Sequence, residues 1–101
     1  MAQLIPASER LDLIPQVDKL VAGIVFKKLT VTSHQVAINI SNASIANDEF
    51  RKWLIEELRT RETLCPRLIF EVEDAALIHH REVAENFCRQ LIQLGLSLIH
   101  I

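Results

Sequence analysis

Two polar residues stand near the ends of two predicted strands and could together hold a metal ion. Asn39 is next to last in Val36–Ile40, and Glu71 lies in LIFEVED, where an apolar run passes into three acids within four residues. Ligands of parallel α/β proteins bind at the carboxyl ends of the strands. If these strands are neighbours in ordinary register, the amide oxygen of Asn39 and the carboxylate of Glu71 lie side by side. Such a pair suits a hard divalent cation, because Mg²⁺ takes a few protein oxygens and keeps several waters.

A solvated strand end explains the same residues without a metal, and on the pattern alone it is the more frequent case. Other reactive residues offer less. His79 and His80 are adjacent, so on a helix they point about 100° apart and do not form the i, i+4 pair that binds one metal well. They indicate an exposed helix start. Cys65 precedes a proline and has no visible histidine and acid that would make it a nucleophile, whereas Cys88 fits a helix core.

The elements that must position Asn39 and Glu71 follow from the spacing of apolar residues. In chain order they are a helix over 12–27 with Pro15 in its first turn, a strand over 36–40, a helix opening at Ser44 or after a short turn there, a strand over 67–72, a helix over 79–94 stopped by Gly95, and a strand over 96–101. The crossovers are long enough for parallel pairing, so the sequence predicts a parallel α/β unit.

The apolar stripes of the three helices are predicted to be packing surfaces. The first stripe consists of Leu13, Val17, Leu20, Val21, Ile24 and Val25. Three parallel strands leave two open edges and too little helical cover, which suits part of a larger domain better than a finished one. We therefore expect the chain by itself to self-associate through open strand edges and exposed apolar helix faces.

Composition narrows the function classes. The chain has 101 residues, half of them hydrophobic, and a net charge of −2, so it offers no electrostatic footprint for nucleic acid. Its two glycines argue against a phosphate-cradling glycine loop. No apolar run approaches the ~20 residues of a membrane-spanning helix, and two cysteines in ordinary contexts suggest reduced thiols in the cytoplasm.

Four segments of the chain resemble the motifs of one bacterial family, in the family's order. VAINISNASI resembles the "NlS" strand of EAL-type cyclic-di-GMP phosphodiesterases, and LIFEVEDAAL resembles their "lEiTEs" strand. The segment LIPASERLDLIPQVDKLV is similar to the "fIPlAEesGlI..ld.wvl" region. FCRQLIQLGLSLIHI is similar to the "l..Lr.lG..iaiDDFG" helix and strand. The resemblance is collinear over nearly the whole chain.

The resemblance implies a TIM-like (β/α)8 barrel, of which residues 1–101 would form a central segment, roughly two-fifths of the ~250 residues of such a barrel. The family hydrolyses cyclic di-GMP with Mg²⁺ or Mn²⁺. By position, Asn39 matches its metal-binding asparagine and Glu71 its metal-binding glutamate. Asp74 falls on a second glutamate that steadies a neighbouring loop.

Departures from the family motifs predict a catalytically degenerate member. Ile101 falls on the first aspartate of "DDFG", Glu73 replaces the motif's threonine, and Asp74 has a shorter arm than glutamate. The chain by itself is expected to be inactive. The resemblance implies a regulatory role in a GGDEF–EAL protein, cytoplasmic or behind a membrane anchor. The alternatives are the core of an active phosphodiesterase and, more remotely, an unrelated α/β binding module.

Overall fold

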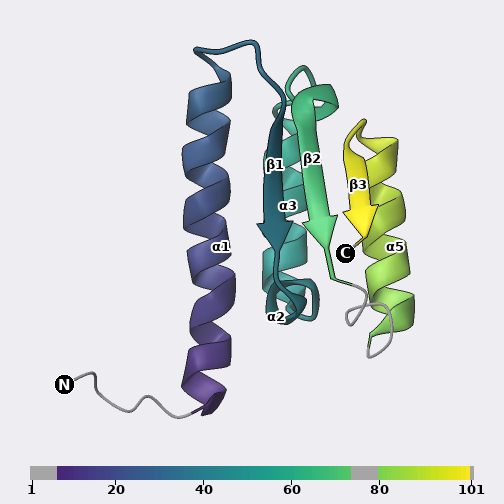
Figure 1. Cartoon of the computed structure of the whole chain (residues 1–101). Helices are drawn as coiled ribbons and strands as arrows, with labels where there is room; N and C mark the ends of the chain where they lie inside the picture. Colours follow the sequence, from purple (N-terminus) through teal and green to yellow (C-terminus); the bar gives the residue numbers. More distant parts are fainter. Residues whose placement is uncertain (1–6, 74–79, 101) are drawn as a thin grey trace, which may run out of the picture.

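The computed structural model describes residues 7–73 and 80–100, with side chains over 13–73 and 80–99. Its elements are, in order, α1 (Ala7–Leu29), β1 (Val36–Ile40), α2 (Asn42–Ile45), α3 (Asp48–Arg59), the 3₁₀ turn η1 (Cys65–Arg67), β2 (Leu68–Val72), α5 (Arg81–Gln93) and β3 (Ser97–His100). The three strands are parallel and lie in the order β1-β2-β3, so the predicted α/β unit is confirmed (Figure 1).

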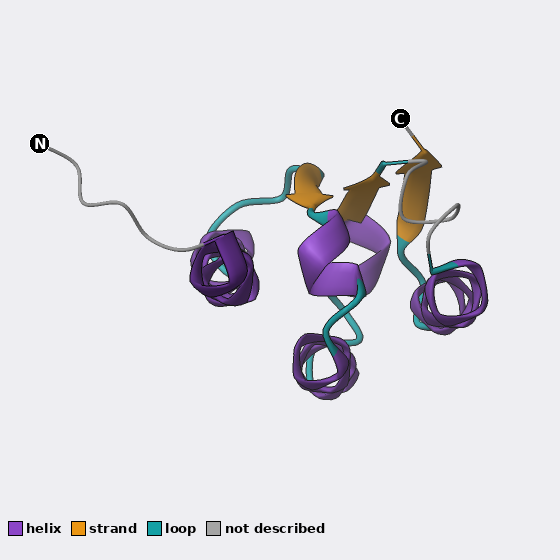
Figure 2. Ribbon diagram, turned by 90° about the horizontal axis from the view of Figure 1, so that it is seen from below, coloured by secondary structure: helices purple, strands orange, loops and turns teal. Residues whose placement is uncertain are grey.

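The sheet is covered by helices on one face. Figure 2 shows α1, α3 and α5 on the same side of the three strands. Ile38 and Ile40 of β1 and Phe70 and Val72 of β2 point into this layer and are at most 4% exposed. Because side chains alternate along a strand, the residues between them lie on the other face, which the described residues leave open.

The start of α3 resolves the choice that the sequence left open after β1. A single turn, α2, comes first, and α3 begins at Asp48. The side chain of Asn47 accepts a hydrogen bond from the Phe50 amide at 2.8 Å, which caps the helix. Asp48 and Glu49 in the first turn favour the same start through the helix dipole.

Gly95 ends the α5 region, as predicted, because it holds a conformation that other residues rarely adopt. Its φ is 105°. The glycine amide donates to the Ile92 carbonyl at 3.0 Å, and the next amide reaches back to Leu91 at 3.2 Å. These bonds satisfy the last carbonyls of the helix and turn the chain into β3.

The packing face of α1 differs from the prediction. The helix begins five residues earlier than expected, at Ala7, so Pro15 lies inside it and not in its first turn. The buried face carries Ala22, Phe26 and Leu29, spaced at i, i+4 and i+7. Most of the predicted stripe lies on the opposite side. Its members are between 42% and 68% exposed: Leu13, Val17, Leu20, Val21 and Ile24.

The prediction was wrong because α1 has apolar residues on both sides, and periodicity alone does not tell which side meets the sheet. The sequence also predicts one stripe of Phe50, Trp53, Leu54, Glu57 and Leu58 on the second helix and one of Val83, Phe87, Leu91 and Leu94 on the third. These two predictions were largely right. Phe50, Leu54 and Leu58 of α3 are buried, as are Phe87 and Leu91 of α5, whereas Val83 is 40% exposed. Over residues 7–73 and 80–100, no helix is both long and apolar enough to cross a membrane.

Candidate metal-binding site

Asn39 and Glu71 are direct neighbours in the sheet. The parallel register of β1 and β2 pairs Asn39 with Glu71, one step before the pair Ile40 and Val72 at the strand ends. Their flanking residues are buried against the helices, so both polar side chains project from the open face at its carboxyl end. Asn39 is exposed and Glu71 is half-buried. The side-by-side placement expected from the sequence is therefore found, and its use as a metal site stays a prediction.

The next position across the sheet is apolar. Glu71 pairs with Ile99 of β3, which is 47% exposed. No group of three or more histidine, cysteine, aspartate or glutamate side chains within the described residues could enclose a metal ion. One neutral amide oxygen and one carboxylate suit Mg²⁺ or Mn²⁺ chemically, but they fill only part of an octahedral shell. The two residues thus fit a divalent cation as an incomplete ligand set.

A second amide and carboxylate contact lies just beyond the strand ends. The side-chain amide of Asn42 donates to Glu73 Oε2 at 3.3 Å, which links the chain after β1 to the chain after β2. The other amide atom, Asn42 Oδ1, is buried and accepts no hydrogen bond from the described residues. Sequence reasoning treated Glu73 only as a departure from the family motif and missed this contact.

Asp18 of α1 supports the end of β1 from the helix layer. Its Oδ2 atom accepts hydrogen bonds from the Ser41 amide at 3.1 Å, the Ser41 hydroxyl at 2.8 Å and the Ser44 hydroxyl at 2.6 Å. Ser41 also caps α2, because its Oγ accepts from the Ser44 amide at 3.2 Å. Sequence reasoning missed Asp18. The available signal was a lone acid within the apolar helix segment IPQVDKLVAGIV.

The other candidate residues lie apart from this site. His80 is exposed at the N-cap of α5, as expected for a solvated helix start. Cys65 and Cys88 are free and buried, and burial, with smaller contributions from Glu62 and Glu85, raises the pKa of both thiols. A raised pKa reduces the thiolate fraction, so neither is an activated nucleophile. Three residues named in the sequence analysis lie outside the described residues: Asp74, His79 and, in the last position, Ile101.

Comparison with known proteins agrees with this architecture. The EAL domain model matches residues 1–99. The chain is 29% identical over 101 residues to the cyclic di-GMP phosphodiesterase PdeB of Shewanella oneidensis, covering 95% of this chain and 12% of that protein.

Among solved structures, the S helix-GGDEF-EAL region of Vibrio cholerae LapD superposes with a TM-score of 0.84 at 22% identity, over 91% of this chain and 23% of that one. The Xanthomonas citri FimX EAL domain in complex with c-diGMP superposes with a TM-score of 0.72 at 16% identity, over 90% of this chain and 38% of that one. The chain thus spans less than two-fifths of the length of each of these relatives. Its three parallel strands and their helices correspond to part of a TIM-like barrel. The predicted resemblance is confirmed: the chain belongs to the EAL domain family.

Proposed function

We propose that the chain is a central segment of an EAL-type domain acting in cyclic-di-GMP signalling, with Asn39 and Glu71 as oxygen ligands of Mg²⁺ or Mn²⁺. The observation that carries the proposal is the register that sets these two residues side by side on the open face. The ligand class is supported by the relatives. FimX and LapD are known in complex with cyclic di-GMP, and Klebsiella pneumoniae BlrP1, at 22% identity and a TM-score of 0.66, in a manganese/cyclic-di-GMP complex.

In such a site a divalent cation would offset phosphate charge and polarise a phosphoryl oxygen. Glu71 supplies the negative charge of the pair, and its half-buried position limits the rotamers it can adopt. Asn39 supplies a neutral oxygen on the exposed side of β1. The ladder between β1 and β2 holds both backbones in register, so the two oxygens are presented together.

We further propose that the complete domain is regulatory and does not turn over the nucleotide. The position beside Glu71 in the sheet is held by Ile99. In the sequence, Ile101 falls on the family's first "DDFG" aspartate, so an apolar residue stands where the family motif has an acid. The alternative, an active phosphodiesterase, is favoured by the retained Asn39–Glu71 pair and by the likeness to PdeB.

The complete EAL-type domain of the parent protein, incubated with cyclic di-GMP and Mg²⁺ or Mn²⁺, separates these functions. Equilibrium dialysis measures binding, and chromatography follows the linear product. We expect cation-dependent binding without product. Glu71→Gln should weaken Mn²⁺ binding at least tenfold, about 1.4 kcal/mol, because it removes the one charge of the pair.

Glu56→Gln is the matched control, because it removes the same charge from an exposed position on α3. Linear product that disappears with Glu71→Ala would support the active phosphodiesterase instead. A complete domain that neither binds nor cleaves the nucleotide would contradict the signalling role itself.

We also propose that the 101-residue chain self-associates through the exposed stripe of α1. Light scattering should give a mass above the 11.5 kDa of one chain. The double change Leu20→Glu and Ile24→Glu should lower that mass, because it sets two charges on side chains that are 68% and 55% exposed. Ile92→Glu on α5, at a similarly exposed position, is the control. A monomeric wild-type chain would contradict this proposal.

A cytoplasmic location for this part of the parent protein is a further proposal. The free, buried thiols of Cys65 and Cys88 support it, because reduced cysteines are usual in that compartment.

A further inference from the structure

We propose that Asp18 is a positioning residue for the Asn39–Glu71 pair, acting through Ser41 and Ser44. The inference rests on the proposed cation site and adds to it a residue of α1, an element that carries neither ligand. Three hydrogen bonds converge on Asp18 Oδ2, at 3.1, 2.8 and 2.6 Å. One of them comes from a backbone amide, so Asp18 holds the main chain of the β1 exit and not only its side chains.

The place where Asp18 acts is close to the proposed ligand. Ser41 directly follows Ile40, the last residue of β1, and is two residues from Asn39. At Asn39 itself, the backbone pairing of β1 with β2 holds the strand beside Glu71. Asn39 is exposed, so its direction depends on the backbone that carries it. The Asp18 contact and the ladder together define that backbone.

Packing alone does not explain a carboxylate at this position. Asp18 lies on the sheet side of α1, close to the buried Ala22, and contacts Ser44, which is 0% exposed. Asp18 itself is half-buried. A polar group that is partly removed from water gains nothing from packing against apolar neighbours unless hydrogen bonds replace the water that it loses. What an apolar residue could not do is accept three hydrogen bonds from one exit turn. The property that Asp18 adds is a fixed geometry for the residues after Asn39.

Each of the two serine hydroxyls has one hydrogen to donate, and both hydrogens can go to Asp18. The Ser44 hydroxyl donates to Asp18, and the Ser41 hydroxyl does the same while its oxygen accepts from the Ser44 amide. The two hydroxyl oxygens also lie 3.0 Å from each other, so Ser41 Oγ, Ser44 Oγ and Asp18 Oδ2 form a compact group. Each hydroxyl therefore has a defined direction, and loss of Asp18 would leave the buried Ser44 hydroxyl without its shortest partner.

The test is a Mn²⁺ titration of the complete EAL-type domain, with free Mn²⁺ followed by electron paramagnetic resonance. Residues that orient metal ligands typically contribute 10–100-fold to metal affinity. Asp18→Ala should therefore raise the Kd for Mn²⁺ by about 10–100-fold, and Asp18→Asn, which keeps the shape and one neutral oxygen, by less. Amide hydrogen exchange at Ser41 should accelerate in the alanine variant.

Arg61→Ala is the matched control. It also removes a side chain that joins α1 to a neighbouring helix, but it acts at the other end of the sheet, so the Kd for Mn²⁺ should stay within about twofold. If Asp18→Ala does not fold, Ser44→Ala provides the second variant, because it deletes the 2.6 Å contact and leaves a methyl group that suits a buried position.

The outcomes separate this inference from the proposed function. Wild-type protein that binds no Mn²⁺, or binds it equally well after Glu71→Gln, overturns the cation site and the role of Asp18 with it. Binding that is lost with Glu71→Gln but unchanged in folded Asp18→Ala or Ser44→Ala overturns the positioning role alone. Binding that is weakened in these variants and kept in Arg61→Ala supports it.

Discussion

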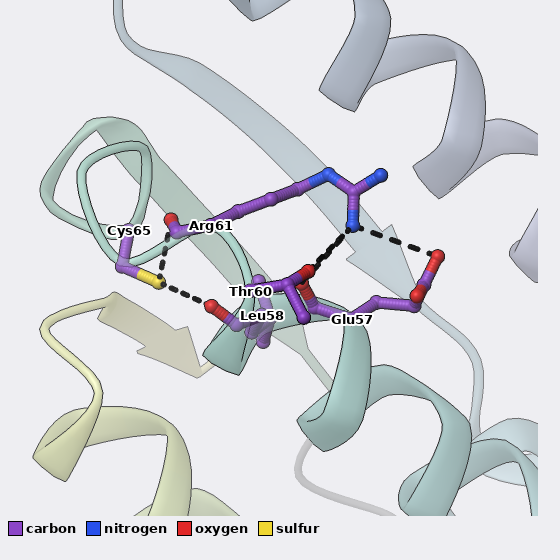
Figure 3. A network of polar contacts seen from close by, with 5 residues as sticks. All are labelled: Glu57, Leu58, Thr60, Arg61 and Cys65. Carbon is purple, nitrogen blue, oxygen red and sulfur yellow. Dashed lines mark hydrogen bonds and ion pairs between the residues drawn. The ribbon is translucent and has the colours of Figure 1, made fainter.

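The two ends of the sheet use their polar residues differently. At the amino end, Arg61 Nη1 donates to the Glu57 carbonyl at 3.1 Å and to Thr60 Oγ1 at 3.2 Å, and lies 3.6 Å from the Glu57 carboxylate (Figure 3). Its guanidinium also stands over the Phe26 ring, 5.1 Å from the centroid. The contacts of Nη1 tie Arg61 to the end of α3, and the stacking on Phe26 joins this region to α1.

Cys65 and Arg67 complete the amino end in the same way. The Cys65 thiol lies 3.5 Å from the Arg61 carbonyl and 3.7 Å from that of Leu58 (Figure 3). Arg67 donates to the carbonyls of His34, at 3.2 Å, and Thr32, and so ties the loop before β1 to the start of β2. At this end of the sheet, the polar side chains mainly contact backbone carbonyls of the surrounding loops and helix ends.

At the carboxyl end, Asn39 and Glu71 instead face outward from the open side of the sheet, while Asp18 holds the exit of β1 from the helix side. This division matches the general asymmetry of parallel α/β barrels, in which the carboxyl end carries function and the amino end carries stability. Changes at the two ends should therefore separate stability from cation binding.

The largest expected effect is on stability at the amino end. Phe26→Ala should lower the free energy of unfolding of the complete domain by about 3–5 kcal/mol, because it empties a buried aromatic site beneath Arg61. Urea denaturation measures the loss. Mn²⁺ affinity of the protein that remains folded should be unchanged.

Leu20→Ala on the exposed side of α1 is the control and should change stability by no more than about 0.5 kcal/mol. Equal losses in the two variants would mean that the exposed stripe is covered in the complete domain.

A smaller loss is expected where α5 turns into β3, also at the amino end. Gly95→Ala should cost about 1–2 kcal/mol, because a residue with a Cβ is strained at φ 105°. The added methyl itself meets Cys65 and Pro66 only at 3.7 Å and beyond, which is ordinary contact. Thermal unfolding measures the loss.

Gly23→Ala provides a control of opposite sign. Gly23 lies within α1, and a Cβ there would meet no atom within 4 Å, so alanine should stabilise the helix by about 0.5–1 kcal/mol. A Gly95→Ala variant as stable as the wild type would show that the turn relaxes without cost.

At the carboxyl end, one part of the candidate site was predictable from sequence and another was not. The pairing of Asn39 with Glu71 was predictable, because strand alternation sets the face of each side chain and the family motifs mark both positions near the ends of their strands. Asp18 was not, because its donors lie 23 and 26 residues away and nothing local links them. The buried side of α1 was missed for a related reason: apolar spacing gives the stripes of a helix, while tertiary packing selects one.

The smallest expected effect is a pH dependence of stability that comes from the buried thiols. Burial, and then the charge of Glu62, raises the pKa of the Cys65 thiol in the folded protein. In the unfolded chain the thiol loses its proton near its ordinary value of about 8.5. Its contribution to stability is therefore fully present below that pH and is lost as the pH rises toward the folded pKa.

Above about pH 8.5 the unfolding free energy should therefore fall as the pH rises, because the unfolded thiol loses its proton before the folded one does. Cys65→Ala should reduce the slope of unfolding free energy against pH. Slopes are compared, not absolute stabilities, because the variant also loses packing of a buried side chain. Cys88→Ala, which removes a thiol whose pKa is raised in the same direction by burial and Glu85, should also reduce the slope. Parallel pH curves for the wild type and both variants would show that the buried thiols are not the groups that titrate.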